Sequence, residues 1–383
     1  MSTGLQPLPL SKHNQSQDRP LLKPDDSYAP ITPEDLSELE KRFAAYVRKD
    51  LYGSMGCGEL PLAEKVKIGV AMVTLVPVRI VAGILLLLVY YVVCRACTLF
   101  KRGSEEVEGD RQEGYAHLGG WRRKVLVGCG RVLARLMLVV FGFYWISLCH
   151  RSRTEEQSEG QRQGEPERPG AIVSNHVSYI DILYHMSSSF PSFVAKRSVG
   201  KLPLVGIISQ CMGCVFVRRE SKSSDFKGVA GVVTERVKEA RENKDAPVMM
   251  LFPEGTTTNG EYLLPFKTGA FLAKSPVRPV ILKYPYQRFS PAWESISGAR
   301  HVIFLLCQFV NHLEVIYLPV YYPSQEEKDD AKLYANNVRR LMAMEGNLVM
   351  SDIGLPEKRV YLAALNVDFS HCQVKLLLCS HMF

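Results

Sequence analysis

The stretch AIVSNHVSYIDILYH covers residues 171–185 and predicts the unit from which the rest of the fold is built. Its apolar start and the polar Ser-Asn-His that ends it are typical of a buried strand followed by a turn. Beyond the turn, Ser178 and Asp181 fit the N-cap and N3 positions of a capping box, which marks the first turn of a helix. The stretch is therefore predicted to be a strand that leads through a tight turn into a helix.

The same alternation continues toward the C-terminus. The expected strands are the apolar runs at residues 170–175, 192–196, 214–219, 247–255, 279–284 and 314–322. Apolar residues recur at helical spacing over 225–244 and over 328–346, where Gly346 is the expected C-cap, and residues 301–312 are expected to form a buried or membrane-surface helix. This alternation predicts an α/β domain over residues 170–365, with a mixed, largely parallel central sheet flanked by helices.

Two long apolar stretches, residues 68–94 and 125–149, precede this domain. Each is longer than the about 20 residues that cross a bilayer. Arginines interrupt both stretches, at Arg79, Arg131 and Arg135. An arginine is costly at the bilayer centre but not near the interface, where its head can reach water. Residues 61–150 are therefore predicted to be a membrane-anchoring helical hairpin, which either crosses the bilayer or dips into one leaflet; a buried soluble core is the third possibility.

Three other segments differ from these regions in composition. Residues 1–60 are rich in proline, serine, glutamine and charge and are predicted to be mostly disordered, with a short amphipathic helix within 31–53. Residues 151–169 have no apolar periodicity and are expected to be a polar linker. Residues 366–383 form a cysteine-rich apolar tail without periodicity, which is an atypical end for a domain and is consistent with an alternative C-terminus.

The overall composition narrows the partners only moderately. A net charge of +8 suits anionic lipid, phosphate-bearing ligands or nucleic acid. No basic, aromatic-spaced nucleic-acid module occurs, so nucleic acid is the weakest of the three. The ten cysteines are scattered rather than arranged as a secreted disulfide framework. The two C-x-x-C pairs, Cys94 with Cys97 and Cys211 with Cys214, are open to zinc binding. Cys94 and Cys97 are also open to acylation beside a membrane, but a buried or interfacial role is favoured.

His176 and Asp181 form the first candidate for chemistry. Five residues separate them, so their side chains lie about 140° apart on a regular helix and cannot share one helical face. They can meet if His176 lies in the turn and Asp181 in the first helical turn. A carboxylate held ionised by the helix dipole can then accept from one imidazole nitrogen and leave the other as a general base for a substrate hydroxyl. The alternative is that Asp181 only caps the helix and His176 is a polar loop residue.

Three further polar clusters are candidate ligand contacts. Glu254 follows an apolar run in a Pro-Glu-Gly turn, and strand ends are where ligands bind in α/β sheets. Arg218 and Arg219 end another expected strand and suit a phosphate. Lys267 precedes a possible helix start, where an anion can bind. Taken singly, each cluster is equally consistent with an ordinary turn or a solvated surface.

The order of these clusters resembles that of the glycerolipid acyltransferase superfamily, whose members carry an H-x4-D motif. Over residues 170–323 the four matching motifs are NHVSYID (175–181), GCVFVRR (213–219), FPEGTTTNG (252–260) and VRPVILKYP (277–285). The residues of these motifs look most like those of the lysophospholipid acyltransferases, in the branch that contains the plant lysophosphatidylethanolamine acyltransferases and the animal lysophosphatidylcholine acyltransferases. Some relatives carry C-terminal calcium-binding EF-hands, and this sequence contains no such loop.

The resemblance implies a role for each matching residue. His176 would be the base and Asp181 its partner. Arg219, with Arg218 beside it, would bind the substrate phosphate. Glu254 would help to shape the acceptor site.

Four details refine these implied roles. Gly255 would shape the acceptor site together with Glu254, which is expected to accept from a glycerol hydroxyl or from backbone amides, because a carboxylate repels phosphate. Many members carry serine or arginine after this glycine, whereas Thr256 supplies no cation. Lys267 remains a candidate anion contact. Lys196, at the end of the next strand, is expected to help bind or polarise the thioester.

The implied activity is acyl transfer from acyl-CoA, as co-substrate, to the free hydroxyl of a lysophospholipid at a lipid bilayer, with lysophosphatidylethanolamine favoured. A thiolate is a good leaving group, so no metal and no bound cofactor are expected. The resemblance also implies an endoplasmic reticulum membrane. Rival functions are acylation of lysophosphatidate or glycerol-3-phosphate, lipid hydrolysis with water as the acceptor, and a membrane scaffold without activity.

Overall fold

The computed structural model describes residues 33–100, 105–107, 110–112, 118–152, 168–217 and 223–365. The helices are α1 (Pro33–Arg42), α2 (Leu62–Thr98), α3 (Gly120–Val140), α4 (Ile180–Ser188), α5 (Val205–Cys211), α6 (Ser223–Glu242), α7 (Gly298–Cys307), α8 (Gln325–Asp329) and α9 (Ala331–Gly346). The strands are β1 (Glu105–Val107), β2 (Asp110–Gln112), β3 (Ile146–His150), β4 (Ala171–Ser174), β5 (Ser192–Lys196), β6 (Val215–Val217), β7 (Met249–Leu251), β8 (Tyr262–Leu263), β9 (Val277–Lys283), β10 (Leu313–Tyr317) and β11 (Val349–Met350).

The largest sheet has seven strands in the order β3-β10-β9-β4-β7-β5-β6. Strands β9, β4, β7, β5 and β6 are parallel to their neighbours in this series, while β10 is antiparallel to β9 and parallel to β3. This confirms the predicted mixed, largely parallel sheet. The carboxyl ends of the five parallel strands therefore meet at one edge, and loops at such an edge commonly carry the functional residues.

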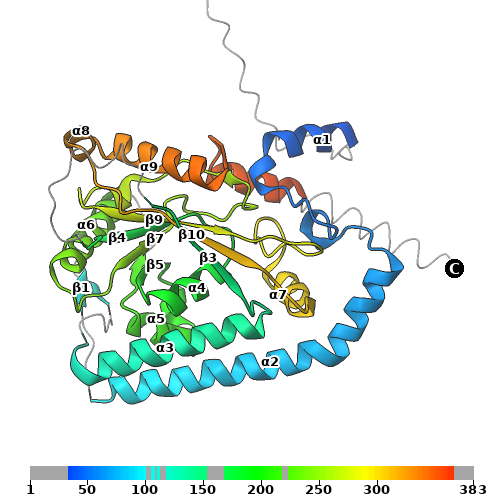
Figure 1. Cartoon of the computed structure of the whole chain (residues 1–383), viewed down its shortest axis with the longest axis horizontal. Coiled ribbons are helices and arrows are strands. Elements are labelled where there is room, and N and C mark those ends of the chain that lie inside the picture. The colour runs from blue at the N-terminus through cyan, green and yellow to red at the C-terminus, as the bar shows by residue number, and fades with distance from the viewer. Residues whose placement is uncertain are drawn as a thin grey trace, which may run out of the picture.

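Helices cover both faces of this sheet, with α9 over one face and α3 and α2 below the other (Figure 1). Successive strand residues face opposite sides, so Ile172 packs toward α3 and α4 whereas Val173 packs toward α6 and α9. The same alternation separates Leu282 from Ile281 on β9. Strands buried on both faces explain why the sequence shows continuous apolar runs rather than an alternating pattern.

Helix α2 is the one helix among the described residues that is long and apolar enough to cross a membrane. It has 37 residues, so it is about 55 Å long at the usual rise per residue. It bends along its length in Figure 1, and Pro77 lies inside it, where a proline removes a backbone hydrogen bond. Most of its apolar surface is exposed, including Val73 and Leu85.

The second apolar stretch, 125–149, is not one helix as the sequence predicted. Helix α3 ends at Val140, and residues 146–150 instead form β3, which pairs with β10. Gly142 has a φ of +87° and its carbonyl accepts from the Asn311 N–H, so the chain turns sharply there. The pairing partner of β3 lies about 170 residues away in sequence, and an apolar run alone cannot reveal it.

The three arginines of these stretches donate hydrogen bonds to backbone carbonyls of the protein. Arg79 is buried and donates to the carbonyls of Leu306 and Gln308, at 2.8 and 2.6 Å. These carbonyls lie at the end of α7, where helical carbonyls lack partners and the dipole favours a cation. Arg131 donates to the carbonyl of Ser188 at the end of α4, and Arg135 donates to the carbonyls of Phe143 and Tyr144 in the turn after α3. The arginines therefore attach α2 and α3 to the rest of the domain.

Part of the N-terminal region that was predicted to be disordered is packed. After α1, which matches the expected amphipathic helix, Phe43, Tyr46 and Tyr52 are buried. Three other predictions lie outside the described residues: the disorder of 1–32, most of the polar linker and the atypical tail after residue 365.

The helices expected in the C-terminal half are present with shifted ends. Helix α6 matches the first, and the second is divided into α8 and α9 by Asp330, which caps α9 through its side chain. Helix α7 ends at Cys307, earlier than predicted. The C-cap of α9 is Asn347, with a φ of +47°, rather than Gly346. Asparagine tolerates this left-handed conformation better than most residues.

Candidate active site

Strand β4 lies beside β9 in the sheet, and Asn175 continues the pairing of these two strands after β4 ends. Its side-chain amide donates to the Leu282 carbonyl at 2.9 Å and accepts from the Leu282 N–H at 2.8 Å. The asparagine side chain therefore replaces one backbone partner of the ladder. This contact fixes where the chain leaves the sheet, and it places His176 at the start of the connecting turn.

Asp181 lies in the first turn of α4 and is fully buried. Its Oδ2 accepts from His176 Nδ1 at 2.8 Å and from the backbone N–H groups of Val177 and Ser178, at 2.7 and 2.9 Å. The structure thus brings together the two residues that the spacing placed in one turn. The two backbone donors of the turn and the imidazole therefore hold Oδ2 in place.

The helix start differs from the predicted capping box. Helix α4 begins at Ile180 rather than directly after Ser178, and the Ser178 hydroxyl is buried without a hydrogen bond to any described residue. Only half of the box forms, in which the Asp181 carboxylate accepts from the Ser178 N–H. The carboxylate is shared with the His176 imidazole, so its position serves the turn as well as the helix.

The imidazole of His176 is held on one face and free at one nitrogen. Its ring stacks on Phe252, with ring centroids 4.1 Å apart and an interplanar angle of 17°. Its side chain is 20% exposed, and Nε2 makes no hydrogen bond to any described residue. A nitrogen that is accessible while Nδ1 binds a carboxylate has the arrangement of a general base.

The Pro-Glu-Gly turn after β7 supports the backbone of His176. Glu254 is buried, its Oε1 accepts from the His176 N–H at 2.8 Å, and its Oε2 accepts from the Leu264 N–H at 2.9 Å. Of the two partners expected for Glu254, the structure shows backbone amides. Burial raises the pKa of Glu254 to about 8, although the two N–H groups oppose the rise.

Gly255 and Lys267 lie against each other beside this turn. Gly255 has a φ of +70°, which favours glycine. A Cβ at Gly255 would lie 2.5 Å from Lys267 Nζ, so the lysine side chain passes close over the turn. The Lys267 N–H also donates to the Pro253 carbonyl at 2.9 Å. The structure therefore places the cationic end of Lys267 beside Gly255 in the Pro-Glu-Gly turn.

Comparison with known proteins identifies the chain. The family model described as Acyltransferase matches residues 154–283. The lysophospholipid acyltransferase LPEAT1 of Arabidopsis thaliana is 61% identical over 377 residues, which cover 93% of this chain and 94% of that protein. The chain belongs to the acyltransferase family.

Less similar relatives match a smaller part of the chain. The lysophosphatidylcholine acyltransferase of Drosophila melanogaster is 34% identical over 76% of this chain, which spans half of that protein. Among solved structures, the 1-acyl-sn-glycerophosphate acyltransferase PlsC of Thermotoga maritima matches with 17% identity and a TM-score of 0.38 over 69% of this chain and 98% of that one.

The other residues that the sequence singled out in this acyltransferase make no hydrogen bond to His176 or Asp181 or lie outside the described residues. Lys196 is exposed at the end of β5, which is separated from β4 by β7. Thr256 is half-buried beside Gly255 and makes no hydrogen bond to a described residue. Arg218 and Arg219 follow β6 and lie outside the described residues. Their assignments remain predictions.

The sequence did not predict three contributors to the site. Tyr284 follows β9 and donates to Asp181 Oδ1 at 2.5 Å. Phe252 and Asn175 fix the ring and the backbone of His176. Tyr284 and Phe252 lie within the matched motifs, so their positions were visible, but their contacts depend on the neighbouring strands. No group of three or more His, Cys, Asp or Glu side chains in the described part of the chain could hold a metal ion.

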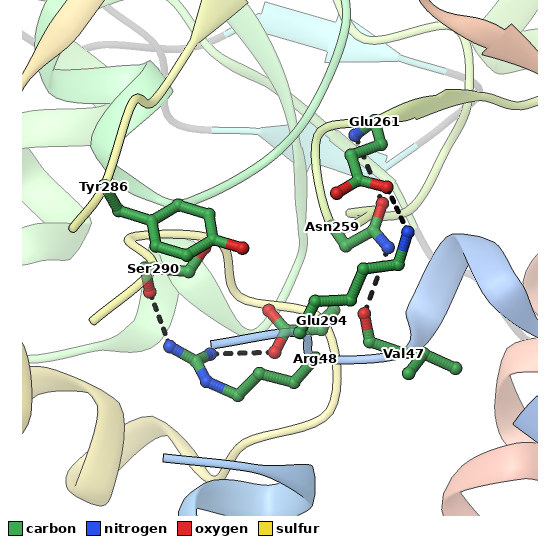
Figure 2. A pocket seen from close by; sticks show the side chains of 8 residues that line it. Val47, Arg48, Asn259, Glu261, Tyr286, Ser290 and Glu294 are labelled. Atoms are coloured by element: carbon green, nitrogen blue, oxygen red, sulfur yellow. Dashed lines mark hydrogen bonds and ion pairs between the residues drawn. The ribbon is translucent and has the colours of Figure 1, made fainter. Parts of the chain in front are cut away.

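The N-terminal segment of the acyltransferase also contacts the loop after the Pro-Glu-Gly turn. Figure 2 shows Arg48 between Glu294 and Ser290, and Asn259 directed toward Val47. Arg48 and Glu294 are both buried, and their atoms lie 2.7 Å apart. The sequence predicted a short amphipathic helix within 31–53 in a mostly disordered region, and it did not predict this contact. Arg48 pairs with a buried carboxylate, and the segment holds the loop that contains Asn259.

Proposed function

We propose that this acyltransferase moves a fatty acyl group from acyl-CoA to the free hydroxyl of a lysophospholipid, with His176 as the general base. The supporting observation is the His176–Asp181 pair, in which Nδ1 is bound and Nε2 is accessible. The acceptor class comes from the names of the similar proteins, and lysophosphatidylethanolamine is favoured over lysophosphatidylcholine by the similarity to LPEAT1.

The proposed reaction needs one proton acceptor and no enzyme nucleophile. His176 Nε2 takes the proton of the acceptor hydroxyl while the oxygen attacks the thioester carbonyl, and Asp181 stabilises the imidazolium that forms. The tetrahedral intermediate then breaks its C–S bond, and CoA leaves as a thiolate that takes the proton back. Base catalysis of this kind supplies about 10²–10⁴-fold in rate. No bound cofactor or metal is proposed, because the thiolate is already a good leaving group.

Anion contacts are proposed for the phosphates of the two substrates. Lys267, close to Gly255, would contact phosphate at the Pro-Glu-Gly turn, and Thr256 beside it can add a hydroxyl. Arg218 and Arg219 are proposed to bind the phosphate of the acceptor, because the resemblance of their motif to that of the acyltransferases implies this role. Lys196 is proposed to assist the thioester from the end of β5.

Helix α2 is proposed to hold the enzyme at a membrane. It contacts the body at its start through Glu64 and Arg288, in the middle through Arg79, and near its end through Cys94 and Cys97, which are buried in the same core cluster as α5. Because α2 is attached to the domain along its whole length, it lies along the surface of the domain, and its exposed apolar side chains face away from it. This favours the alternative in which the anchor enters one leaflet, and an endoplasmic reticulum membrane is the proposed location.

The test is acyl transfer by the purified, detergent-solubilised protein, with one labelled acyl-CoA and a series of lyso-lipids. We expect lysophosphatidylethanolamine to be acylated and His176→Ala to lose at least about 100-fold of that activity. The matched control is His150→Ala, because His150 is exposed at the opposite edge of the sheet, at the end of β3.

Three results would contradict the proposal in different ways. Activity confined to lysophosphatidate or glycerol-3-phosphate would change the acceptor. Release of free fatty acid without an acceptor would indicate a hydrolase. Full acyl transfer by His176→Ala would remove the general base.

A further inference from the structure

The two oxygens of the Asp181 carboxylate have unequal surroundings. Oδ2 accepts from His176 Nδ1 and from two backbone N–H groups, whereas the Tyr284 hydroxyl is the one partner of Oδ1 among the described residues. The carboxylate is fully buried, so water cannot replace a lost partner. An unpaired oxygen on a buried anion is costly. The Oδ1 contact is therefore the one whose loss would matter most.

The Tyr284 ring is fixed by the fold. Tyr284 directly follows β9, the strand beside β4, and it is buried. Its ring packs edge-to-face on Phe143, with centroids 5.9 Å apart. Burial first, and the negative charge of Asp181 second, hold the pKa of Tyr284 well above its usual value of 10. The phenol therefore remains protonated and can only donate to Asp181.

We propose that Tyr284 is a positioning residue of the dyad, whose hydroxyl fixes the Asp181 carboxylate so that Oδ2 points at His176 Nδ1. This inference rests on the proposed function, because it takes His176 and Asp181 as the reacting pair. With Oδ1 held by Tyr284 and Oδ2 held by the turn, the carboxylate cannot rotate about its bond to Cβ. A donor to the carboxylate also disperses its charge and lowers the basicity of the pair.

Five titratable side chains besides Tyr284 surround Asp181. His176, Tyr179 and Glu254 contact or neighbour the turn, and His185 and Tyr184 lie on α4. Burial lowers the pKa of His185 to about 4, so this ring is neutral near pH 7. The pKa of Glu254 is raised to about 8, so Glu254 also titrates in the working range and its variant must be measured in parallel.

The deciding experiment compares Tyr284→Phe with Tyr184→Phe in the acyl-transfer assay over a range of pH. Tyr184 is a suitable control because it is also buried and loses one phenol hydrogen bond, to the Tyr317 hydroxyl at 2.6 Å, without touching Asp181. We expect Tyr284→Phe to lower kcat by about 10- to 100-fold with little change in KM, since a hydrogen bond to a charged group is lost. Without this donor the His–Asp pair is more basic, so the acid limb of the kcat profile moves to higher pH.

A purely structural role gives a different result. Tyr284→Phe and Tyr184→Phe would then lower the melting temperature alike and leave the acid limb in place, and the proposal would be wrong. If the acid limb disappears in Glu254→Gln, that limb reports Glu254, and kcat then decides: a kcat in Tyr284→Phe equal to that in Tyr184→Phe would overturn the proposal. If His176→Ala retains activity in the same assay, it is the proposed function that fails rather than the role of Tyr284.

A second substitution covers the case in which Tyr284→Phe does not fold. Replacing Tyr284 by 3-fluorotyrosine keeps the shape and makes the phenol a stronger donor. The acid limb is then expected to move to lower pH, opposite to the shift in Tyr284→Phe. An acid limb that does not move in this variant would overturn the proposal.

Discussion

Asp181 and Glu254 are both buried carboxylates at the same edge of the sheet, and both contact His176, but at different atoms. Asp181 accepts from the imidazole, and Glu254 accepts from the backbone N–H of the same residue. Asp181 has four donors and lies in a helical first turn, whereas Glu254 has two backbone donors in a turn after a strand. One carboxylate orients the base, and the other fixes the chain that carries it.

The pKa of Glu254 follows from its surroundings. Burial dominates at Glu254, because two amides do not replace the water that a carboxylate loses, and its pKa rises to about 8. Glu254 is therefore suited to holding a backbone. Asp181, which receives four donors, is suited to balancing a positive charge on His176.

The largest effect is expected for Asp181→Asn. An amide at this position cannot stabilise the imidazolium and can direct its NH2 group at Nδ1, which selects the wrong tautomer. We expect kcat to fall by about 10²–10⁴-fold, with the protein still folded. The matched control is Glu327→Gln, a buried carboxylate in the capping box of α8. Equal losses in both variants would mean that Asp181 acts only as a structural carboxylate.

A smaller effect is expected for Glu254→Gln. Above pH 8, where Glu254 is ionised, both of its oxygens accept. The amide NH2 group of the variant must face one of the two backbone N–H donors, so one of the bonds to His176 or Leu264 is lost. We expect kcat to fall about tenfold, in line with the loss of one buried hydrogen bond. A fall as large as that of Asp181→Asn would contradict the division of roles between the two carboxylates and would favour direct contact of Glu254 with substrate.

Glu254 also predicts a pH dependence of stability. The pKa of Glu254 in the folded state is about 8, above the ordinary value of 4.5. Ionisation of Glu254 therefore lowers the free energy of unfolding. This contribution to stability is fully present below pH 4.5 and is lost as the pH rises through 8. The melting temperature of the wild type should therefore fall relative to that of Glu254→Gln between pH 5 and pH 8.5. Parallel melting curves for the two proteins over this range would show that Glu254 does not titrate there.

The smallest effect is expected for Gly255→Ala in the turn that carries Glu254. The positive φ and the nearness of Lys267 make a Cβ unfavourable there, and such a strained position costs about 1–3 kcal/mol of stability. Activity should fall only a few-fold, because Lys267 can shift. Gly269→Ala is the control, since a Cβ there would meet no atom within 4 Å. A similar change in melting temperature for both would show that the turn tolerates a side chain.

The sequence by itself determined the local unit and the class of fold. Short apolar runs that alternate with segments of helical periodicity predicted the mixed, largely parallel sheet. This was possible because the periodicity of a strand or a helix depends only on residues that are neighbours in sequence. The pairing of His176 with Asp181 was predictable for the same reason, because five residues in a strand-to-helix turn leave few arrangements. The order of the four motifs then indicated the acyltransferase family.

The tertiary structure decided the partners that lie far apart in sequence. Tyr284 reaches Asp181 only because β9 lies beside β4, and Glu254 reaches the His176 backbone only because β7 lies on the other side. Pairing with β10 places the end of an apolar stretch in β3, and the carbonyls at the end of α7 bind Arg79. Residue spacing sets directions over a few residues, whereas the choice of neighbour between distant segments depends on the packing of the whole domain.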